Sequence, residues 1–126
     1  MNDRTLLYRQ VHPSWVQHGR PSSQTFKPTP KDNKRLSVYD GDMITPSRAW
    51  EHYTSHLGLA SVGVVSVTVS ECTALELYVI SDPIPFPEHA IIDFSEYSAS
   101  AAEKKAKKLA HLANARGCCH RPDPAP

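Results

Sequence analysis

Hydrophobic residues along this chain follow two spacings, one typical of β-strands and one typical of α-helices. Runs rich in β-branched and aromatic residues predict five strands, at residues 5–11, 36–39, 62–69, 75–80 and 89–94. The run at 62–69 combines a high density of valine with alternation, so we expect it to be a central strand of the sheet.

The first predicted helix spans residues 45–57. Thr45 can cap it with its hydroxyl, and Pro46 suits the first helical position, where the N–H that proline lacks has no partner in any helix. Apolar residues then recur at helical spacing, and Gly58 provides the stop.

The second predicted helix spans residues 100–116. Ser100 and Glu103 have the spacing of a capping box, and Gly117 follows the last turn. Its apolar stripe is mostly alanine, with Leu109 and Leu112 as the larger members. Alanine buries little area, so we expect this helix to dock loosely or to need a partner.

These elements predict an α+β fold: a small mixed or antiparallel sheet of four to five strands with two main helices, at about 45–57 and 100–116. A length of 126 residues suits one hydrophobic core. We therefore expect a single domain over residues 1–117. Residues 118–126 contain three prolines and are predicted to form a flexible tail.

Composition and termini place limits on the class of protein. No apolar run approaches the ~18–20 residues that a membrane span requires, and the first residues do not resemble a secretory signal. The three cysteines form no spaced disulfide framework. We therefore expect a cytoplasmic protein that does not span a membrane.

Charge is segregated along the chain although the net charge is only +1. Residues 1–35 hold seven basic and two acidic side chains, residues 36–97 hold one basic and nine acidic, and residues 98–126 hold six basic and two acidic. The basic ends would favour an anionic ligand if they met in the fold, whereas pairing with the acidic middle is the simpler outcome.

Four lysines crowd the second predicted helix: Lys104, Lys105, Lys107 and Lys108. Such a cluster can contact phosphates of a nucleic acid, or it can dock on a partner protein. The alternative is an ordinary solvated helix face, since no base-reading arginine or aromatic residue lies beside it.

Potential acid–base and metal chemistry is sparse. Glu88 and His89 follow a proline-rich connector, and His89 is a candidate catalytic imidazole or a hydrogen-bonded structural residue. Cys118, Cys119 and His120 lack the spacing of a zinc site, and we expect no bound metal. The Asp-Gly-Asp sequence at 40–42 is predicted to be a turn.

The N-terminal half carries a set of short sequences: LLYRQV with Arg9, HGRPSS with Arg20, LSVY with Tyr39 and RAWEHY with Glu51. In layout this set resembles the RES-type toxins of the ADP-ribosyltransferase-like superfamily. The resemblance implies that Arg9 and Glu51 hold and process NAD.

The same resemblance assigns ligand binding to Arg20, Ser22, Ser23 and Tyr39. A guanidinium can grip a pyrophosphate in two-point fashion, and a carboxylate can stabilise a cation that develops at the ribose.

Three functions remain open from the sequence. The leading hypothesis is a small binding or regulatory protein, an accessory partner of another macromolecule that has no cofactor and no complete catalytic machinery. The second is an ADP-ribosyltransferase-like enzyme that binds NAD or a nucleotide, and the third is nucleic-acid binding through the lysine-rich helix.

Overall fold

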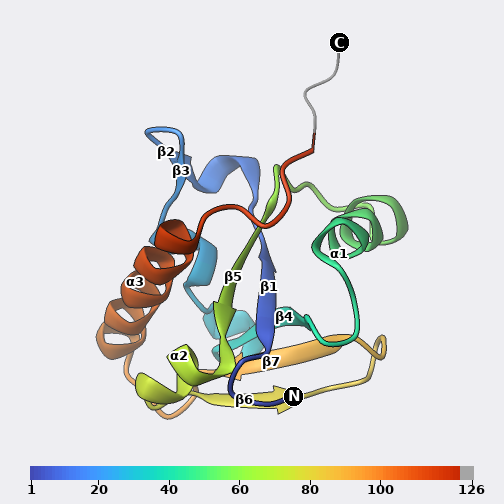
Figure 1. The fold of residues 1–126 in the computed structure, drawn as a ribbon. Coiled ribbons are helices and arrows are strands. Elements are labelled where there is room, and N and C mark those ends of the chain that lie inside the picture. The colour runs from blue at the N-terminus through green and yellow to red at the C-terminus, as the bar shows by residue number, and fades with distance from the viewer. Residues whose placement is uncertain (123–126) are drawn as a thin grey trace.

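The protein folds around a five-stranded antiparallel sheet, as a computed structural model that describes residues 1–122 shows (Figure 1). The strand order is β5-β1-β4-β7-β6. The strands are β1 (Leu6–Gln10), β4 (Arg35–Asp40), β5 (Val64–Thr68), β6 (Tyr78–Ser81) and β7 (His89–Asp93). The predicted α+β class and all five predicted strands are confirmed, and the sheet is antiparallel rather than mixed.

The prediction that residues 62–69 form a central strand is wrong. β5 lies at one edge of the sheet, beside β1, and β4 is the middle strand. The valine density of β5 instead reflects burial on both faces, because Val65 and Val67 join one hydrophobic cluster and Val64 joins the other.

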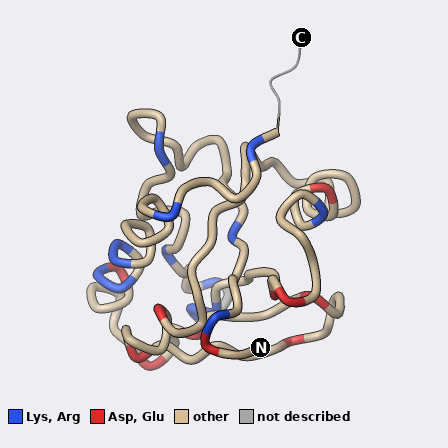
Figure 2. Tube along the Cα trace, viewed as in Figure 1, with Lys and Arg blue, Asp and Glu red and all other residues tan. Residues whose placement is uncertain are grey.

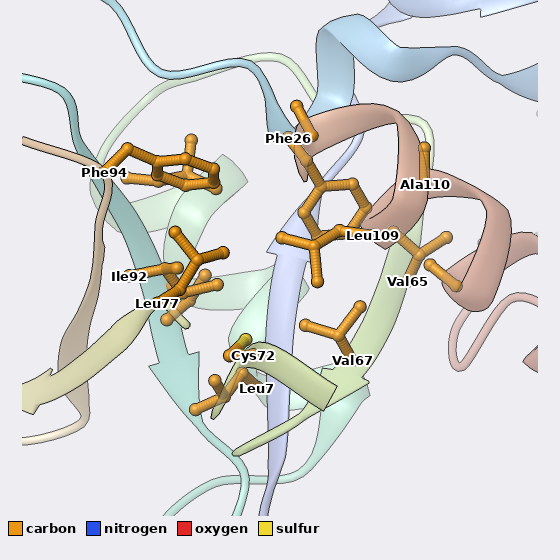
Figure 3. Close-up of a cluster of buried hydrophobic side chains, with 14 of the residues drawn as sticks. Leu7, Phe26, Val65, Val67, Cys72, Leu77, Ile92, Phe94, Leu109 and Ala110 are labelled. Atoms are coloured by element: carbon orange, nitrogen blue, oxygen red, sulfur yellow. The ribbon is translucent and has the colours of Figure 1, made fainter. Parts of the chain in front are cut away.

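The proline-rich region after β1 forms short elements only. It contains 3₁₀ turns at Pro13–Trp15, Ser23–Phe26 and Pro30–Asp32, and a two-stranded ribbon of β2 (Val16–Gln17) and β3 (Arg20–Pro21). Phe26 is fully buried and extends from this region into the main core against Leu109 (Figure 3). This aromatic side chain therefore helps to anchor the region to the domain.

The predicted helix at 45–57 is confirmed as α1 (Pro46–Glu51), which continues into a π-helical turn at His52–His56. The Thr45 hydroxyl accepts a hydrogen bond from the Arg48 N–H at 3.3 Å, as the N-cap prediction requires. The Asp40–Asp42 turn is also confirmed, since the Met43 N–H donates to the Asp40 carbonyl oxygen.

The terminal helix α3 (Ala99–Arg116) has its N-cap at Ser98, two residues before the Ser100 of the capping-box prediction. Ser98 is the N-cap and accepts from the Ala101 N–H, so Glu103 is too far along the helix to reach back to the cap. The capping box in this fold belongs to the short helix α2 (Val69–Ala74), between Thr68 and Glu71.

Two hydrophobic clusters lie on opposite faces of the sheet. α3 and α2 cover one face, and α1 covers part of the other (Figure 1). Five side chains of α3 are buried in the first cluster: Ala102, Ala106, Leu109, Ala110 and Ala113. Small alanines let the helix approach the sheet closely, so α3 is docked within this chain, contrary to the expectation of loose docking.

The start of the segment assigned to a flexible tail is held by the sheet. The Val64 N–H donates to the His120 carbonyl oxygen at 2.9 Å, and the Cys119 N–H donates to the Val64 carbonyl oxygen at 2.8 Å. Residues 118–120 therefore cover the outer edge of β5. Residues 123–126 of the predicted tail lie outside the described residues.

No helix in the described part of the chain is both long enough and apolar enough to cross a lipid bilayer.

Candidate functional site

Three of the residues singled out from the sequence line one cavity of about 430 Å³: Arg9, Tyr39 and His89. The cavity lies over the face of the sheet that α1 leaves partly open. Its floor comes from β1, β4 and β7, and its walls come from the π-helical turn and from the proline-rich connector between β6 and β7. The wall residues include Tyr53, Leu57, Leu59, Ile84 and Phe86. We call this space the sheet cavity.

His89 is buried at the floor of the sheet cavity and is hydrogen-bonded through both ring nitrogens. Nε2 lies 3.0 Å from Ser37 Oγ. Nδ1 lies 3.0 Å from the Asp82 carbonyl oxygen and 3.3 Å from Asp82 Oδ2. Strand pairing explains the Ser37 contact, because β4 and β7 pair Tyr39 with His89 and place Ser37 diagonally next to it on the same face.

Arg9 of β1 hydrogen-bonds to the backbone of two other segments, the second 3₁₀ turn and β4. Its Nε donates to the Thr25 carbonyl oxygen at 2.8 Å, and its Nη1 donates to the Ser37 carbonyl oxygen at 2.9 Å. The guanidinium also lies over the Trp15 ring, 5.3 Å from the ring centroid. Arg9 therefore stabilises the fold and also places a permanent positive charge beside Ser37.

Tyr39 belongs to an aromatic wall. Its ring stacks on Phe86 with centroids 5.2 Å apart, and its hydroxyl lies 2.8 Å from His52 Nδ1. Burial raises the pKa of Tyr39, and the nearby Tyr53 and Glu88 raise it further. The hydroxyl is therefore protonated at neutral pH and available as a hydrogen-bond donor.

The other predicted site residues lie elsewhere. Glu51 lines a second cavity, of about 580 Å³, with Arg48 and Glu88. Arg20 lines a third, of about 550 Å³, next to the β2–β3 ribbon. The structure therefore places Arg9, Glu51 and Arg20 in three different cavities.

Ser22 and Ser23 lie at the start of the second 3₁₀ turn. The Ser22 hydroxyl is buried and has no hydrogen-bond partner among the described residues, and neither serine lines the sheet cavity.

The four lysines of α3 differ in their contacts and exposure. Lys105 Nζ donates to the Leu75 carbonyl oxygen at 2.6 Å and lies 4.3 Å from the centroid of the Tyr97 ring. Lys104, Lys107 and Lys108 are exposed. Lys105 thus ties α3 to the segment before β6, and only the other three present free ammonium groups on the surface.

The outer strand β6 forms a second surface with binding character, which we call the β6 edge. β6 is the last strand in the sheet order, so one side of its backbone has no neighbouring strand in the described part of the chain. Tyr78 is 61% exposed and Ile80 is 44% exposed, and both side chains lie on the same face of the strand.

Acidic side chains surround the β6 edge. Glu76 precedes the strand, Asp82 follows it and Asp93 pairs with Tyr78 across the ladder. In Figure 2 acidic positions lie around α2, the ends of β6 and the turn after β4. Basic positions mark α3 and the β2–β3 ribbon, and some also lie near the N-terminus beside the acidic ones. A cavity of about 560 Å³ opens beside the start of β6, with Glu76 and Glu96 in its lining.

Sequence reasoning missed the two residues of the sheet cavity that lie within hydrogen-bond distance of the His89 ring, Ser37 and Asp82. The signal for Ser37 was its position two residues before Tyr39, which puts both side chains on one face of a strand. Nothing local marked Asp82, because it meets His89 only through the turn of the connector.

Among the described residues, no group of three or more His, Cys, Asp or Glu side chains is placed to hold a metal ion. No protein-family model, no curated protein and no solved structure matches this chain.

Proposed function

We propose that this protein is a binding module that accepts an extended, basic segment of a partner protein as an additional strand beside β6. The observation that carries the proposal is the β6 edge itself: a strand whose outer side has no neighbouring strand in the described part of the chain, with exposed Tyr78 and Ile80, set among acidic side chains. Strand addition of this kind combines main-chain hydrogen bonds with contacts from alternate side chains.

The direction of the backbone groups follows from the ladder. The Asp82 N–H donates to the His89 carbonyl oxygen at 2.9 Å, so Asp82 directs its backbone groups toward β7. In an antiparallel ladder this direction alternates along the strand. Tyr78 and Ile80 therefore also direct theirs inward, while Val79 and Ser81 present an N–H and a carbonyl oxygen each to an added strand.

Charge supports a basic partner. Glu76 and Asp82 stand at the two ends of β6, and Glu76 and Glu96 line the cavity beside its start. A lysine or arginine side chain on the added strand would enter this cavity and approach the carboxylates of Glu76 and Glu96. An acidic strand would meet repulsion at the same positions.

The test is fluorescence anisotropy with a labelled eight-residue peptide of alternating valine and lysine. Ser81→Pro removes one outward N–H and leaves the inward ladder bonds in place, so we expect at least about tenfold weaker binding. Ser81→Ala is the matched control and should bind as the unchanged protein does. The matching valine–glutamate peptide should not bind.

Three outcomes would contradict the proposal. The first is no binding of the basic peptide at low salt, and the second is equal binding to Ser81→Pro and Ser81→Ala. The third is a stable dimer in sedimentation that Ser81→Pro dissociates, because the occupant of the edge would then be a second copy of this chain.

A further inference from the structure

Ser37, His89 and Asp82 form a row of hydrogen-bonded side chains at the floor of the sheet cavity. Ser37 Oγ lies 3.0 Å from His89 Nε2, and His89 Nδ1 lies 3.3 Å from Asp82 Oδ2. Ser37 is exposed, His89 is buried and Asp82 is half-buried. The hydroxyl is thus open to the cavity, while the imidazole behind it is held in place.

The surroundings of His89 determine which nitrogen carries the proton in the neutral ring. Nδ1 faces the Asp82 carbonyl oxygen at 3.0 Å and the Asp82 carboxylate at 3.3 Å. A carbonyl oxygen and an ionised carboxylate only accept hydrogen bonds, so Nδ1 must carry the hydrogen. Nε2 is then the acceptor, and the Ser37 hydroxyl is the donor that points at it.

We propose that Ser37 is a nucleophile, activated by His89, that accepts the acyl group of carboxylic esters entering the sheet cavity. The arrangement has the three roles that serine acyl transfer requires: a hydroxyl, a base within hydrogen-bond reach, and a carboxylate that orients the base. Ser37 and His89 are the catalytic residues, and Asp82 is a positioning residue. This activity does not rest on strand addition at β6, although Asp82, which follows that strand, contributes to both proposals.

The chemical step balances within these groups and water. Ser37 Oγ forms a bond to the ester carbonyl carbon while its proton moves to His89 Nε2. The bond from that carbon to the alcohol oxygen then breaks, and His89 returns the proton to the leaving alcohol. His89 then takes a proton from water while the water oxygen bonds to the acyl carbon. The bond from that carbon to Ser37 Oγ breaks, and His89 returns the proton to Oγ as the carboxylic acid leaves.

The walls indicate the class of ester. Tyr39 and Phe86 stack with ring centroids 5.2 Å apart, and Tyr53, Leu57 and Leu59 complete an apolar lining. An aromatic or medium-length aliphatic acyl group matches this lining. The Arg9 guanidinium donates to the Ser37 carbonyl oxygen, so its positive charge lies beside Ser37 and would help to stabilise the negative charge that develops on the ester oxygen.

Labelling with a fluorophosphonate tests the nucleophile directly. Ser37 Oγ would displace fluoride from phosphorus and leave a covalent adduct that peptide mass spectrometry assigns to residue 37. Ser37→Ala should remove the adduct, and His89→Gln should slow labelling by about 100-fold or more. Ser100→Ala, which removes an exposed serine of α3, should label as the unchanged protein does.

Hydrolysis of 4-nitrophenyl phenylacetate separates positioning by Asp82 from a purely structural role. Asp82→Asn keeps the backbone carbonyl that orients Nδ1–H but loses the carboxylate charge, so kcat should fall about tenfold at unchanged KM, and Asp82→Glu should restore part of it. Absence of an adduct on Ser37, or equal labelling rates in His89→Gln and the unchanged protein, would overturn the proposal.

Discussion

At the scale of single residues, Glu71 connects two helices. Its Oε1 accepts from the Thr68 N–H at 2.8 Å, which completes the capping box of α2, and from Arg116 Nη1 at 2.9 Å, at the end of α3. Burial alone would raise the pKa of Glu71, but the Arg116 hydrogen bond and charge, with the Thr68 bonds, hold it below the usual glutamate value. The ionised carboxylate is therefore stabilised in the fold.

This lowered pKa gives a pH dependence of stability. A carboxyl whose pKa is lower in the folded than in the unfolded state contributes stability above the unfolded value, about 4.3, and loses it as the pH falls through the folded value. Glu71→Gln should thus cost about 1 kcal/mol of unfolding free energy at pH 7 and much less near pH 3.

Urea denaturation at the two pH values measures the effect of Glu71→Gln. Glu103→Gln, at an exposed position of α3, is the control and should change stability little at either pH. A loss that is equal at pH 7 and pH 3 would show that the charge of Glu71 contributes nothing.

Part of the sheet cavity could be predicted from the sequence. His89 was predicted from its imidazole beside Glu88 at the start of a strand, whereas Arg9 and Tyr39 were predicted from the layout of short sequences in the N-terminal half. Ser37 was passed over because its role depends on the register between β4 and β7, which no local pattern specifies.

At the scale of elements, α3 illustrates how small side chains stabilise by proximity. Each buried alanine contributes little area, but the stripe lets the helix axis approach the sheet. Phe26 lies against Leu109 of α3, and Phe94 belongs to the same buried cluster (Figure 3). The sequence pattern correctly identified the buried face. It underestimated the packing because these two aromatic rings come from other parts of the chain.

The close approach of α3 predicts the effect of a larger side chain. Ala106 is fully buried in the main cluster, so Ala106→Leu should lower the free energy of unfolding by about 1–3 kcal/mol through overpacking. Chemical denaturation measures this value. Lys107→Leu introduces the same side chain at the exposed neighbouring position and should cost little; a similar loss in both variants would contradict tight docking of α3.

Strand positions followed well from alternation, but strand order did not. Valine density in β5 indicated burial on both faces, and a central strand is one way to achieve that. Here α3 and the α1 cluster cover the two faces of an edge strand instead. A central strand and an edge strand covered on both faces therefore have the same valine-rich sequence.

At the scale of the whole molecule, the two edge strands of the sheet, β5 and β6, differ in what covers them. Residues 118–120 cover β5 with backbone hydrogen bonds, whereas β6 has no such cover among the described residues. Gly63 permits this cover, because a Cβ there would lie 2.8 Å from the His120 carbonyl oxygen and 3.2 Å from Cys118 Sγ.

Gly63→Ala should therefore detach the covering segment. We expect a loss of about 1–2 kcal/mol and faster hydrogen exchange at the Val64 amide, which donates to His120. His120→Ala removes the imidazole but keeps these backbone bonds, so exchange at Val64 should stay slow. Unchanged exchange in Gly63→Ala would show that the segment tolerates the added methyl group.

The position of β1 between β4 and β5 has a consequence for how the domain forms during synthesis. β1 leaves the ribosome first among the strands, but both of its sheet neighbours, and the helices α2 and α3 that contribute to the hydrophobic cluster of Leu7, are translated later. A nascent β1 therefore exposes an apolar strand without its partners, and pairing over such sequence separations is slow. We therefore expect dependence on chaperones to be greatest before β4, β5 and α3 have been synthesised.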